Sequence, residues 1–597
     1  MGRWPISNCT SPLATRLSAV SADDGPRSLR VKTDVLYYGD NLEILRKYVP
    51  DASVDLVYLD PPFNSNRDYN VIFKDESGRK SDAQLLAFED TWHWGPDAEE
   101  QYAYLTNTAR NAGRVPSTVS TIVAALRSGI GENQMMAYLV EMAVRLVELH
   151  RVLKPTGSLY LHCDPTASHY LRVLLDGTFG PAAFVNEVVW KRTHSHGSGR
   201  RFGAVHDVLL VYSRSDQRTW NPQLVDYSDE YVEGFFKFRE INGRRYRSTI
   251  LTGTGTRNGS SGLPWRGYDP TSVGRHWAVP SYVRKLLPMP EGTVQEALDQ
   301  LDQAGRILWP AKKGGVPSFK QYIDDMGGVA PQDLWTDIPP ISSQAAERLG
   351  YPTQKPEALL ERIIGTSSNP GDIVLDPFCG CGTALVAAQK LGRRWIGIDI
   401  TYLSIAVMKA RLKDSFGLPD VEVIGQPTDV DGARQLLVGA GLEGQYQFQW
   451  WALDLIGAQP QGGTQKKGAD KGIDGVISFS TGPRGEVGRA LVSVKSGGVN
   501  SSMIRDLKGV LEREKAEIGL FVTLDEPSAP MRLEASTAGV YHSDLSGRDY
   551  GRIQILTIAE LLEEHRRPDL PLLVLPTYQR AERVEKKAAE QAELFGG

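Results

Sequence analysis

The sequence predicts an α/β fold class, with one large sheet, an inserted region and a second, smaller α/β domain. Two short apolar runs, at 56–59 and 373–375, have the residue types of buried strands, and each is followed by an Asp-Pro pair. After the second pair come a glycine-rich turn, a helical stretch over 384–391 and another strand over 395–399. This order is typical of nucleotide-binding sheets, which place their ligands at the carboxyl ends of strands. We therefore expect a Rossmann-like sheet.

Composition restricts the classes of protein to consider. The 597 residues are 41% hydrophobic and 23% charged, which is typical of a soluble globular protein. Its formal net charge of −5 provides no general attraction to nucleic acid, so any DNA-binding surface must be a local basic groove. The four cysteines lack the spacing of a zinc site and fit a reducing cytoplasm. With no membrane-length apolar run and no signal peptide, we expect a cytoplasmic protein without a membrane partner.

The first Asp-Pro pair lies in Asp60-Pro61-Pro62-Phe63, a stretch suited to binding a planar amine. Proline fixes φ and has no N–H, so the carbonyls of Asp60 and Pro61 are held in a stiff turn beside a carboxylate. The carboxylate and a carbonyl can accept the two hydrogens of an NH2 group, and Phe63 can stack on its ring. Taken alone, the tetrapeptide fits an ordinary strand-to-turn transition equally well.

The second Asp-Pro pair begins Asp376-Pro377-Phe378-Cys379-Gly380-Cys381-Gly382-Thr383. Asp399 follows the glycines by about twenty residues, the spacing at which an acid binds ribose hydroxyls. Proline and phenylalanine take the place of the first glycine of the dinucleotide fingerprint, and no Gly-Lys-Ser/Thr follows for a triphosphate. The pattern therefore predicts a cofactor that has a ribose and no pyrophosphate.

Together, the two motifs resemble the amino-group DNA methyltransferases that use S-adenosylmethionine, and their order resembles that of the β class. Further matches are the segments 38–42, 186–190 and 351–356, and the resemblance covers roughly 33–415. It implies the catalytic residues Asp60, Pro61, Pro62 and Phe63. It implies the cofactor-binding residues Asp40, Asn41, Gln354, Lys355, Asp376, Phe378, Gly380, Gly382, Thr383 and Asp399.

The reaction implied by this resemblance is methyl transfer to the N6 amine of an adenine flipped out of double-stranded DNA. The amine is a poor nucleophile because its lone pair is conjugated into the ring, so positioning and hydrogen-bond acceptors matter more than a strong base. Aspartate before Pro-Pro-Phe favours adenine, and cytosine N4 is the alternative. No Pro-Cys motif is present for carbon-5 methylation. A regulatory protein that keeps the cofactor fold without turnover is the alternative from another class.

The other elements of this part follow from apolar spacing and turn residues. We expect a strand from 33, a helix through 45, a helix over 135–153, strands at 158–163, 185–190 and 208–212, and a closing helix over 402–413. The stretch 64–132 is irregular and polar, so it is either a loop that covers the active site or a structural insertion.

Two basic regions are candidates for DNA binding. The glycine-rich stretch 191–201 includes Arg200 and Arg201 and is either a loop over phosphates, which we favour, or a solvated hairpin. Residues 216–345 fit the α/β pattern poorly and interleave basic residues, including Arg245 and Arg275, with aromatic ones. In β-class enzymes the target-recognition region falls here, although we expect most of these aromatic rings to form the core of a small domain.

The last part of the chain predicts another α/β domain, with a helix over 448–456 and two strands that place Asp474 near Lys495. It resembles Mrr-type restriction endonucleases, in which an acid and a lysine hold Mg²⁺ and activate water. Gln449 and Ser493 stand where that family has acidic or Glu/Gln residues.

Because of these two departures, an acid would have to come from Asp506 or Glu512 on the next helix. The domain therefore either cleaves DNA with Mg²⁺ or only binds DNA.

The expected organisation is a flexible arm over 1–32, the catalytic half of a methyltransferase domain over 33–215, a target-recognition region over 216–345, the cofactor-binding half over 346–430, a linker over 431–444, the Mrr-type domain over 445–577 and a charged helical tail over 578–597. The expected partners are double-stranded DNA and either a second copy of the chain or a restriction subunit.

Overall fold

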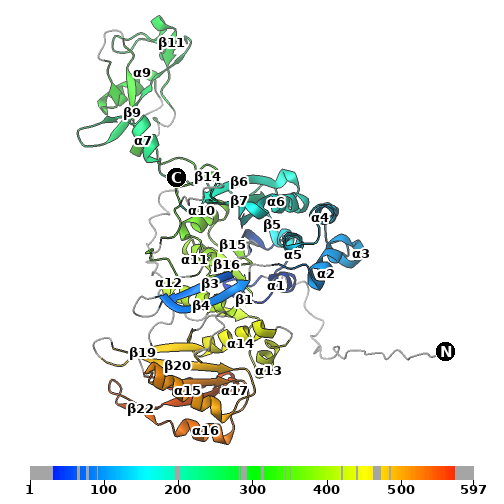
Figure 1. The fold of residues 1–597 in the computed structure, drawn as a ribbon. Coiled ribbons are helices and arrows are strands. Elements are labelled where there is room, and N and C mark those ends of the chain that lie inside the picture. The colour runs from blue at the N-terminus through cyan, green and yellow to red at the C-terminus, as the bar shows by residue number, and fades with distance from the viewer. Residues whose placement is uncertain are drawn as a thin grey trace, which may run out of the picture.

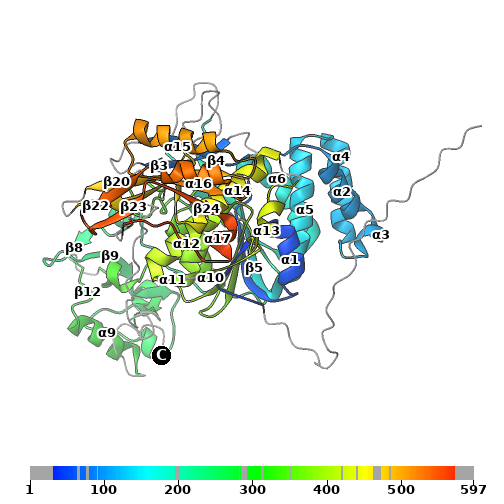
Figure 2. The same cartoon turned by 90° about the horizontal axis from the view of Figure 1, so that it is seen from below.

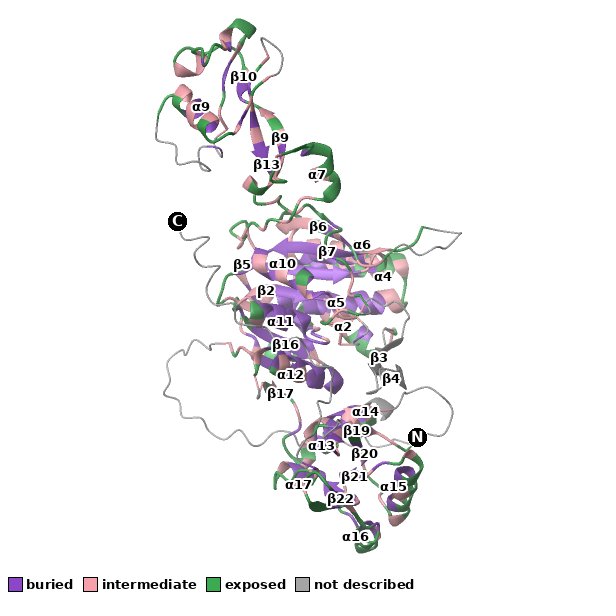
Figure 3. Ribbon diagram, turned by 90° about the vertical axis from the view of Figure 1, so that its left-hand side faces the viewer, coloured by how far each residue is buried: buried purple, intermediate pink, exposed green. Residues whose placement is uncertain are grey.

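The computed structural model describes residues 31–62, 68–74, 80–89, 92–194, 202–280, 283, 292–310, 315–342, 344–349, 351, 353–418, 421–438, 441–461, 472–482, 486–571 and 574. A large α/β domain lies in the centre, a small domain lies at one end and a second α/β domain lies at the other (Figures 1 and 3). The proposed arm and tail fall almost entirely outside the described residues. Within the described residues, no helix is long and apolar enough to cross a membrane.

The central domain is built on a nine-stranded sheet with the order β14-β6-β7-β5-β2-β15-β16-β1-β17. Its strands are β1 (Val35–Tyr38), β2 (Val54–Leu59), β5 (Leu153–Cys163), β6 (Phe184–Lys191), β7 (His206–Ser213), β14 (Leu334–Trp335), β15 (Ile373–Asp376), β16 (Arg394–Asp399) and β17 (Glu422–Ile424). Only β7 runs antiparallel to its neighbours, β5 and β6. The predicted α/β fold class with a Rossmann-like sheet is confirmed.

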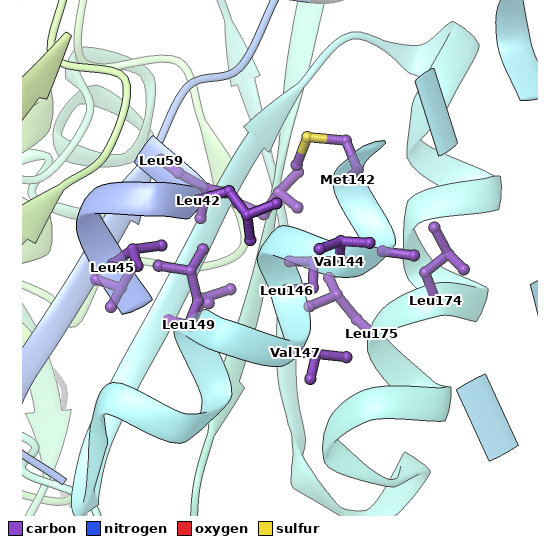
Figure 4. Close-up of a cluster of buried hydrophobic side chains, with 14 of the residues drawn as sticks. Leu42, Leu45, Leu59, Met142, Val144, Leu146, Val147, Leu149, Leu174 and Leu175 are labelled. Atoms are coloured by element: carbon purple, nitrogen blue, oxygen red, sulfur yellow. The ribbon is translucent and has the colours of Figure 1, made fainter. Parts of the chain in front are cut away.

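Helices bury both faces of this sheet, so its central strands are mostly apolar. One group is α1 (Asn41–Tyr48), α5 (Gln134–Val152) and α6 (Pro165–Phe179); the other is α10 (Glu357–Ser367), α11 (Thr383–Lys390) and α12 (Tyr402–Phe416). Alternate residues of β2 point to opposite faces of the sheet. Val57 packs in the core with α1, α5 and α6. Leu56 and Tyr58 pack in the core with α10, α11 and α12. Figure 4 shows the first core, where Leu42 and Leu45 meet side chains of α5.

The stretch 64–132 is not the irregular loop that we expected. It contains the antiparallel pair β3 (Asp68–Lys74) and β4 (Lys80–Glu89) and the helices α2 (Pro96–Thr106), α3 (Thr108–Asn111) and α4 (Ser117–Ile130). The helices extend the α1, α5 and α6 layer (Figures 1 and 2). They contribute few core residues, such as Leu105, Val119 and Val123, so polar residues conceal the helical pattern.

The small domain is inserted between β7 and β14. It contains α7 (Asp229–Phe235), β8 (Phe238–Arg239), β9 (Arg245–Ile250), β10 (Thr252–Thr254), β11 (Arg275–Trp277), α9 (Val294–Gln303), β12 (Ile307–Leu308) and β13 (Ser318–Tyr322). It has a core of its own, in which Trp265 and Trp277 are buried. These two aromatic residues therefore stabilise the insertion, as expected.

The C-terminal domain has a five-stranded sheet with the order β18-β19-β20-β21-β24. Its elements are α14 (Gly441–Leu455), β18 (Gln459–Pro460), β19 (Gly475–Ser480), β20 (Val487–Lys495), α15 (Ser501–Glu514), β21 (Ile518–Thr523), α16 (Ala529–Ser536), β22 (Val540–Ser543), β23 (Arg548–Gly551), β24 (Ile553–Thr557) and α17 (Ile558–Leu562). The stretch that we expected to be a linker contains α13 (Val430–Gln435) and the start of α14.

Candidate active site

Four aspartates lie at the carboxyl ends of four neighbouring parallel strands. Asp60 follows β2, Asp376 ends β15, Asp399 ends β16, and Asp40 lies two residues beyond β1. The chain leaves β2 towards β5 and leaves β15 towards β16, so the sheet order reverses between β2 and β15. Ligands of open α/β sheets bind at such a reversal. All four aspartates line one cavity of about 1130 Å³.

Burial controls the charge of this cavity. Asp376 is only 2% exposed, and this burial raises its pKa well above the usual range; the nearby carboxylates of Asp60 and Asp399 raise it further. Burial also raises the pKa of Asp399, although the N–H groups of Thr401 and Gly380 donate to its carboxylate and counteract the effect. Acidic side chains outnumber basic ones among the lining residues. The cavity is therefore suited to a ligand that carries positive charge.

The glycine turn between β15 and α11 lies at one wall of the cavity. Gly380 and Gly382 have φ angles of +50° and +76°, in the left-handed region that favours glycine. A Cβ atom on Gly382 would lie 2.8 Å from Cγ of Met408. The N–H of Gly380 donates to Asp399 at 2.9 Å, which ties the turn to the end of β16. Phe378 and Thr383 flank this turn and line the cavity with it.

Asp40 and Asn41 connect the glycine turn to two helices. Asp40 caps α1 by accepting from the N–H of Leu42 at 2.7 Å, and it also accepts from Arg145 at 2.7 Å. Asn41 donates to the carbonyl of Pro377 at 2.8 Å and accepts from Arg145 at 2.6 Å. Arg145 was not predicted as a site residue, although an arginine within an apolar helical stretch is a signal in itself.

Lys355 lies nearer to the predicted catalytic carboxylate than its expected cofactor role implied. Its ammonium donates to Oδ2 of Asp60, and both side chains are mostly buried. The adjacent Gln354 accepts from the N–H of Leu349 at 2.8 Å and donates to the carbonyl of Glu347, so it braces the segment before α10. Both Gln354 and Lys355 line the cavity. Neither contact could be inferred from sequence spacing.

A buried network of polar side chains supports β2, the strand that Asp60 follows. The hydroxyl of Tyr58 lies 2.9 Å from Nδ1 of His162, and Nε2 of His162 lies 3.2 Å from Asp207. Arg192 forms an ion pair with the other oxygen of Asp207 at 3.0 Å. Burial raises the pKa of Tyr58 well above its usual range, so its hydroxyl stays protonated. A histidine in an apolar strand was the available signal for this network, which the sequence analysis missed.

Two further sets of residues line the cavity. Trp92 and His93 come from the stretch before α2. Their position favours the first alternative for 64–132, that this stretch covers the active site, over a purely structural insertion. Tyr446, Gln447 and Trp450 come from α14 in the C-terminal domain and were not predicted to belong to this site.

Two of the arginines predicted to bind DNA, Arg245 and Arg275, lie in the small domain, and three other predicted site residues are not described. Phe63, Arg200 and Arg201 lie outside the described residues. Arg275 donates to the side-chain oxygen of Thr252 at 2.8 Å and to its carbonyl at 2.9 Å, which joins β11 to β10. Arg245 lies on β9 of the small domain, paired with Arg239 on β8.

Asp474 and Lys495 are close together in the C-terminal domain, as expected, with 3.7 Å between Nζ and Oδ2. The Asp474 carboxylate is however held by protein donors: the N–H of Val494 at 2.6 Å and the amide of Gln449 at 3.2 Å. Gln449, whose amide donates to the Asp474 carboxylate, thus stands where an acid would bind a metal ion together with Asp474.

The two acids that were expected to complete this metal site lie on the helix that follows β20. Asp506 and Glu512 are exposed on α15. Among the described residues, no group of three or more histidine, cysteine, aspartate or glutamate side chains could hold a metal ion. Mg²⁺ normally requires several oxygen ligands.

The fold is Rossmann-like, and its acidic, glycine-edged cavity lies where open α/β sheets bind their ligands. Residues 54–407 match the family model described as DNA methylase (N6_N4_Mtase). This match covers more than half of the chain, so the protein belongs to that DNA methylase family. Residues 449–563 match the model described as NACHT-associated inactive Restriction Endonuclease 1.

Similar curated proteins include restriction-modification methyltransferases. The chain is 33% identical over 264 residues to the Type II methyltransferase M.EcaI of Enterobacter cloacae, covering 44% of this chain and 54% of the relative. It is 26% identical over 372 residues to the Mod subunit of the Type III enzyme StyLTI of Salmonella typhimurium, covering 59% and 49%. The matches thus span about half the length of these relatives. Over 70 residues, 12% of this chain and 24% of the relative, it is 54% identical to the DNA adenine methyltransferase YhdJ of Escherichia coli.

Solved structures similar to this chain include the complex of M1.HpyAVI with S-adenosylmethionine, at 14% identity and a TM-score of 0.28, covering 63% of this chain and 97% of that one. The cytosine-N4-specific PvuII DNA methyltransferase matches at 14% identity and a TM-score of 0.25, covering 62% and 84%.

Proposed function

We propose that this protein transfers a methyl group from S-adenosylmethionine to the N6 amine of adenine in double-stranded DNA. The observation that carries the proposal is the convergence of Asp60, Asp376 and Asp399 with the glycine turn on one cavity. Membership of the DNA methylase family supports the reaction type. The similarity of one segment to a DNA adenine methyltransferase, together with aspartate before Pro61, favours adenine over cytosine.

The residues of the cavity fit the chemistry of S-adenosylmethionine, which carries positive charge on its sulfonium and amino groups. The surplus of acidic side chains complements this charge. Asp399 would accept hydrogen bonds from the ribose hydroxyls. Ile400, the next residue, is 55% exposed on the cavity wall and offers an apolar surface to the adenine ring. When bound, the cofactor supplies an electrophilic methyl group.

Asp60 and the Pro61 carbonyl would accept hydrogen bonds from the two N–H groups of the target amine. These acceptors draw electron density onto the nitrogen as it attacks, and they orient its lone pair towards the methyl group. As the nitrogen bonds to the methyl group, the carbon–sulfur bond would break, S-adenosylhomocysteine would leave, and one N–H proton would be released to water. In the structure, Lys355 pairs with Asp60. This ion pair compensates the charge of Asp60 before the base enters, and the amine must then share or replace the ammonium. Cytosine N4 presents the same two hydrogens and is the second candidate target.

The modified base in the genomic DNA of cells that express the chain distinguishes adenine from cytosine as the target. Genomic DNA from cells that express the chain should contain N6-methyladenine, detected by mass spectrometry of nucleosides, and cells that express Asp60→Ala should lack it. N4-methylcytosine in its place would correct the target, and the absence of both would overturn the proposed function.

We infer that the C-terminal domain does not cleave DNA by itself. The support is the Asp474 carboxylate, which accepts from Gln449 and Val494 instead of facing a second acid. Cleavage that accompanies methylation would then require a separate restriction subunit. The similarity to a Mod subunit supports such a partner.

A further inference from the structure

Helix α14 belongs to the C-terminal domain by sequence, yet it packs on the methyltransferase domain. One hydrophobic core contains Tyr402, Leu403 and Val407 of α12 together with Phe448 and Trp450 of α14. Figures 1 and 3 show α14 on the side of the C-terminal domain that faces the central sheet. The two domains are therefore joined by a continuous buried interface as well as by the chain.

Two polar contacts fix the position of α14 on α12. The side-chain oxygen of the buried Gln447 accepts from the N–H of Tyr402 at 3.1 Å. This N–H lies in the first turn of α12, where backbone donors have no partner within the helix. At the other end of the contact, Nζ of Lys409 lies 2.8 Å from Oδ2 of Asp454. Neither Lys409 nor Asp454 lines the cavity.

The exposed end of this interface is a wall of the cofactor cavity. Tyr446, Gln447 and Trp450 line the cavity together with Asp399 and Ile400. The rings of Tyr446 and Trp450 stack, with centroids 6.1 Å apart and an interplanar angle of 24°. They form a flat aromatic surface near the strand end that is suited to a ribose.

Trp450 also carries an unused donor. Its side chain is 5% exposed, and its Nε1 is buried without a hydrogen-bond partner in the part of the chain that the structure describes. Buried N–H groups are nearly always paired, so an acceptor on a ligand in the cavity that Trp450 lines would satisfy this donor.

We propose that the C-terminal domain completes the cofactor pocket, with Trp450 and Tyr446 contacting the adenosine portion of S-adenosylmethionine. This inference rests on the proposed use of that cofactor. Adenosine offers ring nitrogens and ribose oxygens as acceptors for the indole N–H, and a flat ring for the aromatic surface. Because the pocket needs both domains, cofactor binding and docking of the C-terminal domain strengthen each other by the same factor.

The direct test measures binding of S-adenosylmethionine and S-adenosylhomocysteine to the full-length protein by calorimetry. Trp450→Ala should raise Kd about tenfold or more, as expected for a buried aromatic contact. Trp450→Phe, which keeps a ring but removes the donor, should have a smaller effect. Gln445→Ala is the matched control on the same helix, because Gln445 is exposed and does not line the cavity; its affinity should equal that of the wild type.

A charge exchange tests the coupling without touching the cavity. Asp454→Lys places two lysines against each other across the interface and should weaken cofactor binding. Lys409→Asp combined with Asp454→Lys restores opposite charges and should return the affinity towards the wild-type value. This rescue also shows that the single variant is folded apart from its docking contact.

The outcomes separate the two proposals. Wild-type affinity in Trp450→Ala or in Asp454→Lys would overturn the role of the C-terminal domain while leaving the cofactor assignment in place. Equal weakening in Gln445→Ala would also overturn it, because the effect would then not be specific to the cavity wall. A wild-type protein that binds neither compound would overturn the cofactor assignment itself, and this inference with it.

Discussion

Asp60 is the residue on which the proposed chemistry depends, and its surroundings are built to hold one carboxylate in one place. Pro61 follows it, Lys355 pairs with it, and the strand behind it is braced by Tyr58 on His162. Once the target amine shares or replaces the Lys355 ammonium, a carboxylate held in this way can accept a hydrogen bond from the amine without further reorganisation during the reaction.

Asp60→Ala should abolish methyl transfer and leave cofactor binding nearly unchanged, because Asp60 is proposed to contact the target adenine and not the cofactor. Transfer of a labelled methyl group to DNA, measured beside calorimetric binding of S-adenosylmethionine, checks both parts. Retention of more than about a tenth of the activity would remove Asp60 from the catalytic role.

Asp399→Ala should have the opposite pattern and weaken cofactor binding by roughly 1–3 kcal/mol through lost hydrogen bonds to the ribose. Part of this loss is indirect, because Asp399 also accepts from the N–H of Gly380 and holds the glycine turn. Calorimetry measures the change, and an unaltered affinity would exclude Asp399 from the site.

Cofactor affinity should rise with pH in the acidic range. Burial raises the pKa of Asp376 and of Asp399, so these carboxyls keep their protons at higher pH than usual. The positively charged cofactor favours the ionised form of both carboxyls, so cofactor binding releases protons. The affinity therefore falls as the pH falls through the raised pKa values. Calorimetry in buffers of different ionisation enthalpy measures the released protons. Binding without proton release at mildly acidic pH would contradict this account.

Among the elements, the turn from β15 to α11 tolerates little change, because its conformation and its packing both require glycine. At Gly382 the positive φ and the approach of Met408 act together. At Gly392, which also has a positive φ of +72°, a Cβ would meet nothing within 4 Å.

Gly382→Ala should therefore destabilise the protein and impair cofactor binding, whereas Gly392→Ala should cost only the backbone strain of about 1–2 kcal/mol. Thermal unfolding with and without S-adenosylhomocysteine compares the two. Equal effects of both substitutions on cofactor binding would show that the packing around Gly382 is unimportant.

At the scale of the whole molecule, the chain joins a methyltransferase domain to an endonuclease-like domain that lacks an acidic metal site among its described residues. The interface through α14 gives that second domain a position beside the cofactor cavity. Its expected contribution is therefore to the pocket rather than to cleavage.

Unmethylated DNA that contains the recognition sequence should stay intact when the purified protein is incubated with Mg²⁺ or Mn²⁺. One carboxylate, already bonded by Gln449 and Val494, provides too few oxygens for either ion. Lys495→Ala should leave methylation unaltered. Metal-dependent cleavage that disappears in Lys495→Ala would reverse the inference.

Local chemistry along the chain was enough to predict the fold class, most central strands and the glycine turn. Asp-Pro pairs, apolar runs and glycines act over a few residues, so their effects can be predicted without knowing the rest of the fold. The same reasoning failed for α2 to α4, because their few buried residues have partners only in the folded domain.

Tertiary structure alone decided which distant groups meet. Lys355 reaches Asp60 across 295 positions of the chain, and Gln449 reaches Asp474 from another element. The wall that Trp450 adds to the cofactor cavity likewise comes from a different domain. Spacing within a sequence specifies how one element folds, whereas these contacts depend on how whole elements pack, and that is determined by the burial of their apolar faces together.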